Sequence, residues 1–272
     1  MRSGFDILRA VMVAALLISG ERAARGEDIA VDLELVLAVD VSLSMDQDEQ
    51  MMQLEGYVAA FRHPDVIDAI RSGLRGRIAV IFVEWGGVAF QQVKVPWTLI
   101  DGEKTAHGFA DALSGRGLTL MPRTSLSDAI DYAAGLFHGN GFRGLRRVID
   151  ISGDGPNNQG TPVTRSRDRA VAKGITINGL PILLRPGESP GFFGIPNLDV
   201  YYEDCVIGGT GSFLVPVRRR ANFTEAIRRK LILEIAGPAP RLLRASQTAR
   251  PRVDCLIGEK LWDQWLDGLT AD

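Results

Sequence analysis

Short apolar runs recur along the chain, separated by longer polar stretches. They occupy residues 33–39, 78–83, 148–151 and 175–182. Runs of this length rich in Val, Ile and Leu are typical of strands buried on both faces of a parallel sheet. Residues 88–95 instead alternate apolar and polar side chains directly after two glycines, which favours a hairpin and an antiparallel edge strand. We expect residues 212–217 to form the final strand.

Between these runs the apolar spacing becomes helical. Stripes at three- and four-residue intervals predict helices over 50–62, 125–137 and 222–235, and Asn222 is a suitable N-cap for the last. Strands that alternate with helices predict an α/β fold, with a doubly wound, mostly parallel sheet, one antiparallel edge strand and helices on both faces, as in Rossmann-like domains. The stripes are Met51, Leu54, Val58 and Phe61; Leu126, Ile130, Ala133 and Phe137; and Phe223, Ile227, Leu231 and Ile235.

The N-terminal segment is predicted to be a signal peptide over residues 1–24. A basic start is followed by an apolar run at 10–18, which is too short to span a bilayer, and then by small residues at Gly20, Ala23 and Ala24. An amphipathic first helix and an uncleaved membrane anchor are the alternatives. The signal predicts a periplasmic or secreted bacterial protein with no integral membrane span after cleavage, and a main domain over 25–236.

Residues 237–272 are predicted to be a linker and a short C-terminal helix. The linker is rich in Arg and Pro, and apolar residues at helical spacing follow it. This helix either packs back onto the domain or binds a partner or a membrane surface. The two cysteines, Cys205 and Cys255, lie on opposite sides of the linker. In an oxidising compartment they form an intramolecular disulfide, an intermolecular one, or remain two separate thiols.

Composition narrows the function classes. The chain has 272 residues, of which 46% are apolar and 24% charged, as in an ordinary globular protein. Its 31 basic and 33 acidic residues give a formal net charge of −2. Because no excess of positive charge is present, we expect no nucleic-acid partner.

The candidate chemistry begins where the first apolar run ends, at the sequence D-V-S-L-S over residues 40–44. In a doubly wound sheet, ligands bind beyond the carboxyl ends of the strands. One carboxylate and two hydroxyls at alternate positions supply oxygen ligands suited to a hard cation such as Mg²⁺, Mn²⁺ or Ca²⁺. Taken alone, the pattern fits equally well a turn that caps the next helix.

Two further segments extend this pattern. Thr124 opens a predicted helix and is followed by Ala129 and Ile130, and the run at 148–151 leads to Asp154 and Gly155. Together the three segments resemble the von Willebrand factor type A (VWA) domain over residues 33 to about 236. The series also resembles an exported bacterial VWA family with no assigned function. The resemblance implies a metal-ion-dependent adhesion site (MIDAS). Its ligands would be Asp40, Ser42, Ser44, Thr124 and Asp154.

One position departs from the family pattern. VWA domains usually have Thr or Ser directly before the third-loop aspartate, whereas Gly153 stands there in this chain. Asp150 is a poorer ligand candidate than Asp154, because we expect it to be buried in the middle of a strand. Glu84 and Trp85 either lie near the site, or Glu84 bonds a loop backbone and Trp85 packs beneath it.

The resemblance implies a binding module without catalytic residues, which ligates an Asp or Glu carboxylate of a protein partner through a divalent cation. The alternative is a metal-dependent hydrolase, such as a phosphohydrolase, that uses the same cation. Such an enzyme needs a nucleophile or a second carboxylate-rich site. Asp46 and Asp48 are the nearest carboxylates, but they fall at a helix start, where they favourably face the helix dipole. The three histidines lie in unrelated segments without zinc-site spacing.

Overall fold

The computed structural model describes residues 27–115, 121–184, 194–237 and 252–270. Within these ranges, five strands form one sheet in the order β3-β2-β1-β4-β5. The β1–β2, β1–β4 and β4–β5 pairs are parallel, and β3 pairs antiparallel with β2 at the edge, so the predicted fold class is confirmed. The strands are β1 (Ile29–Asp40), β2 (Ile78–Trp85), β3 (Gln91–Ile100), β4 (Phe142–Gly153) and β5 (Ile175–Pro181).

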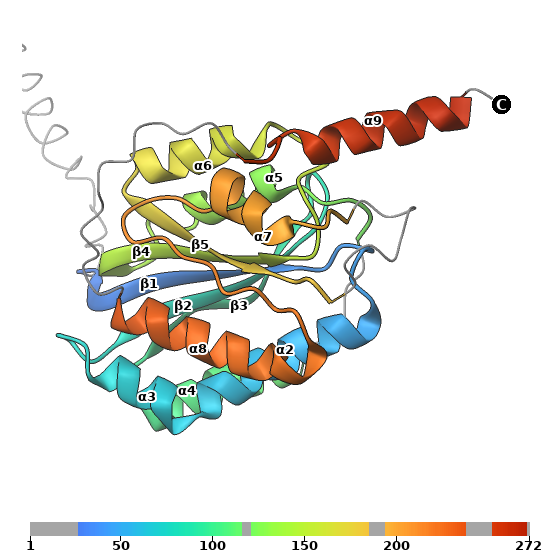
Figure 1. Ribbon diagram of the computed structural model, residues 1–272. Helices are drawn as coiled ribbons and strands as arrows, with labels where there is room; N and C mark the ends of the chain where they lie inside the picture. Colours follow the sequence, from blue (N-terminus) through green and yellow to red (C-terminus); the bar gives the residue numbers. More distant parts are fainter. Residues whose placement is uncertain (1–26, 116–120, 185–193, 238–251, 271–272) are drawn as a thin grey trace, which may run out of the picture.

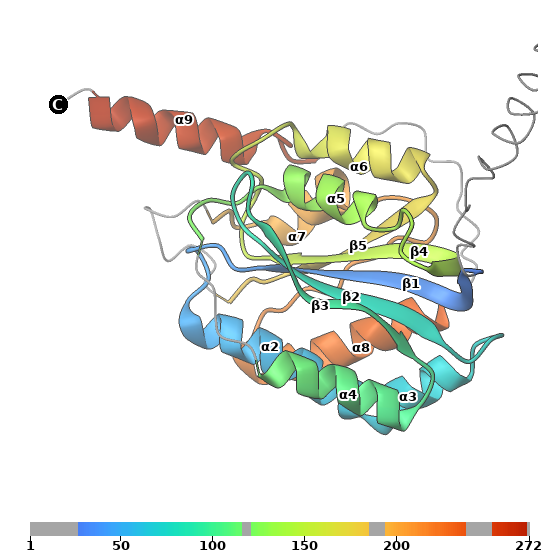
Figure 2. The ribbon, with the colours of Figure 1, turned by 180° about the vertical axis from the view of Figure 1, so that it is seen from behind.

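Helices cover both faces of the sheet (Figures 1 and 2). One layer contains α2 (Gln47–Arg62), α3 (Pro64–Arg71), α4 (Glu103–Ser114) and α8 (Phe223–Ala236). The other contains α5 (Leu126–Gly135), α6 (Val163–Ala172), α7 (Leu198–Tyr201) and the π-helical turn η1 (Tyr202–Val206). A 3₁₀ turn, η2 (Arg220–Asn222), leads into α8, and α9 (Ile257–Thr270) extends outward from the body. No helix in the described ranges is long and apolar enough to cross a membrane.

Side-chain alternation along β1 divides the core in two. Leu33, Leu35 and Leu37 are buried against α2, α4 and α8, whereas Val36 and Ala38 are buried against α5 and α6. Because both faces of β1 are covered, the strand is apolar throughout its centre. This arrangement explains the nearly continuous apolar run that predicted it.

Two details of the sequence-based prediction are wrong. Met51 does not belong to the buried stripe of α2, because its side chain is 42% exposed. The buried face of α2 instead includes Gln50 and Gln53, and the Gln53 amide donates to the Asp40 carbonyl at 3.5 Å. Residues 212–217 do not form a strand, since they make only isolated bridges with the chain at Gly179 and Ile182. Pro216 lacks the backbone N–H that a continuous ladder requires.

The other helix predictions hold. The apolar stripes predicted for α5 and α8 are buried. Asn222 occupies the N-cap position of α8 but makes no capping hydrogen bond through its side chain. The predicted signal peptide over 1–24 and most of the predicted linker lie outside the described residues.

Cys205 and Cys255 form an intramolecular disulfide, with their Cα atoms 5.5 Å apart. This is the first of the three alternatives left open by the sequence. Arg252 reinforces the connection, because its backbone amide donates to Asp204 at 2.6 Å and its guanidinium to Glu203 at 2.5 Å. The start of α9 is therefore anchored to η1.

Candidate metal site

The candidate site lies beyond the carboxyl ends of β1 and β4. These strands are parallel neighbours in which Val39 pairs with Ser152, so the loops that follow them emerge side by side. The segment before α5 joins them through Met121, whose amide donates to the Val41 carbonyl at 2.9 Å and whose carbonyl accepts from Leu43 at 2.8 Å. Three segments distant in sequence thereby meet at one edge of the sheet.

Four of the five candidate ligands form a continuous hydrogen-bond network. The Ser42 amide donates to Asp40 Oδ1 at 2.7 Å, and the Ser42 and Ser44 hydroxyls share a hydrogen bond of 2.7 Å. The Ser44 hydroxyl in turn donates to Asp154 Oδ1 at 2.5 Å. The first and third loops are therefore in direct contact through side-chain oxygens.

Thr124, the fifth candidate, is held by a different partner. Its amide donates to Asn158 Oδ1 at 3.0 Å, and the Asn158 amide donates back to the Thr124 carbonyl at 3.0 Å. Ser125 is the N-cap of α5 and accepts from the Asp128 amide, so Thr124 stands just before the helix. Thr124 lines the same pocket as Ser42 and Ser44, and the structure thus brings all five candidates to one place.

The electrostatics of Asp40 fit a bound cation. Its side chain is fully buried, its Oδ2 atom has no hydrogen-bond partner, and it makes no ion pair with any Lys or Arg in the described part of the chain. Burial, and then the negative charge of Asp154, raise the pKa of Asp40 well above its usual range. A buried carboxylate oxygen without a partner is costly, and a set of two carboxylates and three hydroxyls suits a hard divalent cation.

The departure from the family pattern at Gly153 has a steric cause. A Cβ atom placed there would lie 2.8 Å from Asp40 Oδ2 and 2.8 Å from the Tyr202 hydroxyl. Trp85 also lies close, with Cζ2 3.4 Å from the same point. The Thr or Ser expected from the family therefore has no room, because Tyr202 from η1 occupies the space. Of the two alternatives left open for these residues, Trp85 lies beside the site and is fully buried, whereas Glu84 pairs with Lys94 at 3.0 Å.

Three ionisable side chains that were not assigned to the metal site have partners within the fold. Asp150 is buried in β4 and contacts Lys230 at 2.5 Å. Asp46 is the N-cap of α2 and accepts from the Glu49 amide at 2.7 Å, as its position at a helix start predicts. His63 caps α3 by accepting from the Asp65 amide at 3.2 Å.

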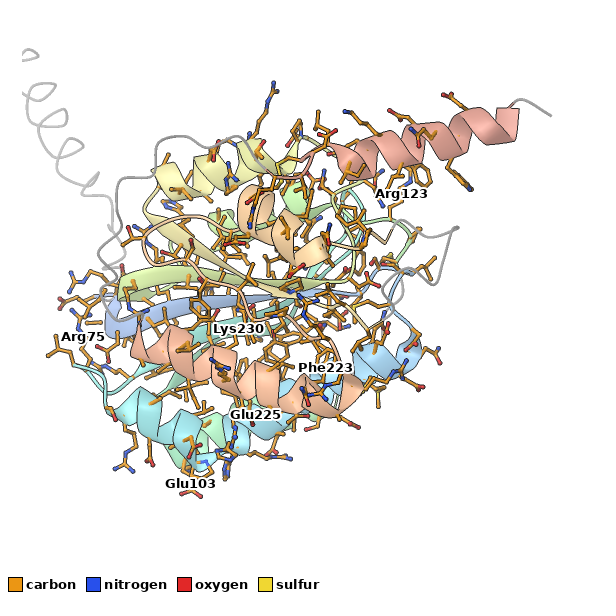
Figure 3. The ribbon with its side chains drawn as sticks, in the orientation of Figure 1. Arg75, Glu103, Arg123, Phe223, Glu225 and Lys230 are labelled. Carbon is orange, nitrogen blue, oxygen red and sulfur yellow. A yellow bond between two sulfur atoms is a disulfide. The ribbon has the colours of Figure 1, made fainter. Side chains whose placement is uncertain are left out.

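Sequence reasoning missed two neighbours of the site, Arg123 and Trp262. Arg123 has a positive φ of 70°, and its guanidinium lies 3.7 Å from the ring centroid of Trp262 in α9 (Figure 3). A pocket of about 230 Å³ opens between the candidate ligands and α9. It is lined by Ser42, Leu43, Ser44, Pro122, Arg123, Thr124, Gly155, Asn158, Trp262 and Trp265.

The sheet order, the antiparallel edge strand and the oxygen-rich loops at the carboxyl edge define a VWA-type domain. More particularly, residues 30–239 match the family described as "Protein of unknown function (DUF1194)", and the chain belongs to that family. No curated protein sequence matches the chain.

Solved structures of low sequence identity share the fold. Proximal thread matrix protein 1 from the mussel byssus aligns with a TM-score of 0.54 and 13% identity over 77% of this chain and 49% of that one. A second structure of it, with a zinc-occupied MIDAS motif, gives a TM-score of 0.50 and 12% identity over the same shares. The pilus adhesin SpaC from Lactobacillus rhamnosus GG gives 0.55 and 10% over 77% of this chain and 31% of that one. The chain thus spans half or less of these proteins.

Proposed function

We propose that this protein is an exported binding module that ligates a carboxylate of a protein partner through a divalent cation. Asp40, Ser42, Ser44, Thr124 and Asp154 would hold the cation. The observation that carries the proposal is the buried Asp40 carboxylate, whose Oδ2 atom has no hydrogen-bond partner within the described ranges while its loop is linked by hydroxyls to Asp154.

The ligand set explains why such a site would bind a partner. When bound, Mg²⁺, or Mn²⁺ or Ca²⁺ in its place, supplies an electrophilic centre that accepts an oxygen of an incoming Asp or Glu. Asp40 and Asp154 provide negative charge, whereas the serine and threonine hydroxyls coordinate without adding any. Because only two ligands are anionic, the bound cation would keep positive charge that attracts the partner's carboxylate. The free-energy cost of removing that carboxylate from water is smaller when it pairs directly with the cation.

Two fold neighbours support an adhesion-type role. The mussel byssus protein has been solved with a zinc-occupied MIDAS motif, and SpaC is a pilus adhesin. Sequence identities of 12% and 10% support a shared fold only. The role proposed for this chain therefore depends on its own residues.

Export to the periplasm or the cell exterior is part of the proposal. The Cys205–Cys255 disulfide supports it, because such bonds persist in oxidising compartments. Mass spectrometry of protein recovered from an exporting host should show a mature chain that begins after Gly20 or Ala24. Retention of Met1 together with membrane fractionation would instead indicate an anchored protein.

The hydrolase alternative has less support. Within the described residues, no group of three or more His, Cys, Asp or Glu side chains is placed to hold a metal ion. The second, carboxylate-rich metal site that two-metal hydrolysis needs thus has no candidate cluster among the described residues to support it. Asp46, its nearest candidate, already caps α2.

The function is tested by capturing a partner on immobilised protein in Mg²⁺, with EDTA elution as the readout. We expect EDTA to release the partner and Asp40→Ala to abolish capture. Asp48→Ala, which removes an 84% exposed carboxylate from the adjacent helix, should leave capture unchanged. Turnover of a phosphoester panel in Mg²⁺ or Mn²⁺, lost in Asp40→Ala, would establish the hydrolase alternative instead.

A further inference from the structure

The C-terminal helix contributes a wall to the pocket beside the candidate metal site, although it lies beyond the family match, which ends at residue 239. Trp262 and Trp265 of α9 face Ser42, Ser44 and Thr124 across this pocket. Figures 1 and 2 show α9 starting against the body near α5 and extending past its edge. The pocket is therefore composite, lined by the domain and the C-terminal helix together.

Specific contacts fix the first turns of α9 in this place. Asn157 donates to Glu259 at 2.7 Å, and the disulfide at Cys255 anchors the segment just before the helix. A Cβ atom on Gly258 would clash with the Asn157 carbonyl, so the helix approaches the third loop as closely as a glycine allows. The side-chain oxygen of Asn157 also accepts a hydrogen bond from the Ser127 backbone amide at 3.0 Å, so Asn157 connects α9 to the start of α5.

The lining of the pocket is mostly apolar, and among the described residues Arg123 is its charged member. Leu43 is 51% exposed and Trp265 is 43% exposed, an unusual display of large apolar side chains next to a polar site. Arg123 makes no ion pair with any carboxylate in the described part of the chain and stacks on Trp262. Its positive φ of 70° is a strained conformation that the fold retains at this position.

We propose that the pocket selects a partner segment in which an Asp or Glu stands directly beside an apolar side chain such as Leu, Met or Phe. This inference builds on the proposed function, because the acidic residue is the one that reaches the cation. The neighbouring apolar side chain fills the pocket between Leu43 and the two tryptophans. A pocket of about 230 Å³ accommodates such a side chain, since a protein cavity of about 150 Å³ already binds benzene.

The charge pattern favours this occupant over a purely apolar one. Arg123 in the pocket lining attracts the acidic segment, because the described lining contains no carboxylate that pairs with it. The apolar part of the affinity then depends on α9. Removing the Trp265 indole should weaken binding of the best acidic–apolar peptide about tenfold, since it exposes roughly half of a buried Leu or Phe side chain.

Selection from a random peptide library tests the proposal. The full chain is immobilised in Mg²⁺, and bound peptides are eluted with EDTA and sequenced. We expect enrichment of Asp or Glu with an adjacent large apolar residue. The Trp265→Ala variant should keep the acidic preference and lose the apolar one. Leu74→Ala, which removes an 87% exposed leucine on the connection between α3 and β2, is the matched control and should select as the wild type does.

The outcomes separate the two proposals. Acidic peptides without an apolar neighbour, or an unchanged preference in Trp265→Ala, would overturn the role of α9 while leaving metal-dependent binding intact. Failure to obtain any EDTA-eluted peptide would overturn the proposed function itself. Mg²⁺ affinity measured in Trp265→Ala must equal that of the wild type, because the indole is not a ligand. Self-association of the chain that Trp265→Ala abolishes would show that a second copy is the occupant, which contradicts this proposal.

Discussion

Two pairs of carboxylates meet along β4 and the loop that follows it, and the two pairs are held in different ways. Asp150 in β4 and Glu234 in α8 share the Lys230 ammonium, with Nζ 2.5 Å from an oxygen of each. Figure 3 labels Lys230 on α8. Asp40 and Asp154, at the carboxyl edge, are linked through the Ser42 and Ser44 hydroxyls. The first pair contains its own cation.

This difference distinguishes a structural charge cluster from a ligand site. The Lys230 cluster contains its own cation: Lys230 is 1% exposed, Asn178 donates to Glu234 at 3.1 Å, and Tyr57 donates to Asp150 at 3.5 Å. Glu234 Oε2 accepts no hydrogen bond in the described ranges, but Lys230 contacts the other oxygen of Glu234 at 2.5 Å. Asp40 is equally buried and also has an oxygen without a hydrogen-bond partner, but it makes no ion pair with a Lys or Arg in the described ranges, and its loop adjoins a pocket lined by Ser42. A buried carboxylate with no basic side chain beside it in the described ranges is the arrangement expected where an external cation completes the charge balance.

The largest effect on stability should come from removing the internal cation. Lys230→Met leaves Asp150 and Glu234 buried and facing each other, which should cost about 3–5 kcal/mol of unfolding free energy in urea titrations. Lys260→Met is the matched control, because Lys260 pairs with Asp254 at the same 2.5 Å but has a 59% exposed side chain. We expect the control to change stability by less than about 1 kcal/mol. Equal effects of the two variants would contradict the comparison.

The disulfide should have the next largest effect. The bond joins residues 50 apart in sequence, and replacing both cysteines by serine should lower the unfolding free energy by roughly 2–4 kcal/mol. Its presence is checked by thiol titration of denatured, unreduced protein, which should find no free thiol. Two titratable thiols per chain would rule the bond out, and a dimer on non-reducing gels would indicate an intermolecular bridge.

Glu234 should give a smaller, pH-dependent effect. Burial, and then the charge of Asp150, raise its pKa from an ordinary 4.5 to about 8. Because the folded state favours the protonated acid, its contribution to stability is present below pH 4.5 and is lost as the pH rises toward 8. Melting temperatures across this interval should fall more steeply in the wild type than in Glu234→Gln, whose side chain does not titrate. Parallel curves would refute the raised pKa.

The sequence predicted much of the fold and of the site for one physical reason. Strands buried on both faces need continuous apolar runs, and ligands of such sheets bind beyond the carboxyl ends of the strands, so Asp40 could be placed at that edge from the residues. Its grouping with Asp154 came from the resemblance to VWA domains. The extent of β1 and β4 was underestimated, because their first residues alternate with charged ones.

What the sequence could not reveal depends on packing between distant segments. Tyr202 fills the space next to Gly153, and Trp262 lies over Arg123, but neither proximity follows from spacing along the chain. The Lys230 cluster did leave a signal. Lys230 and Glu234 fall on the flank of the apolar stripe of α8, three and seven residues after Ile227, where burial is expected.

Gly153 allows a smaller test of how tightly the site is packed. Gly153→Ala would force Asp40 Oδ2 and the Tyr202 hydroxyl from positions 2.8 Å from the new methyl group. We expect metal affinity to fall about tenfold, which corresponds to about 1.4 kcal/mol. Adding Tyr202→Phe removes the competing oxygen and should recover part of the loss. No change in Gly153→Ala, or no recovery in the double variant, would show that Gly153 does not set the position of Asp40.

The central claim is that Asp40 binds a cation from outside whereas Asp150 serves the fold. Calorimetric titration of the full chain with Mg²⁺ tests it most directly, using Asp40→Asn and Asp150→Asn as isosteric variants on neighbouring strands. We predict that Asp40→Asn stays folded and loses measurable Mg²⁺ binding, and that Asp150→Asn keeps the affinity of the wild type within about twofold. Unchanged Mg²⁺ affinity in folded Asp40→Asn, or its loss in folded Asp150→Asn, would contradict the account.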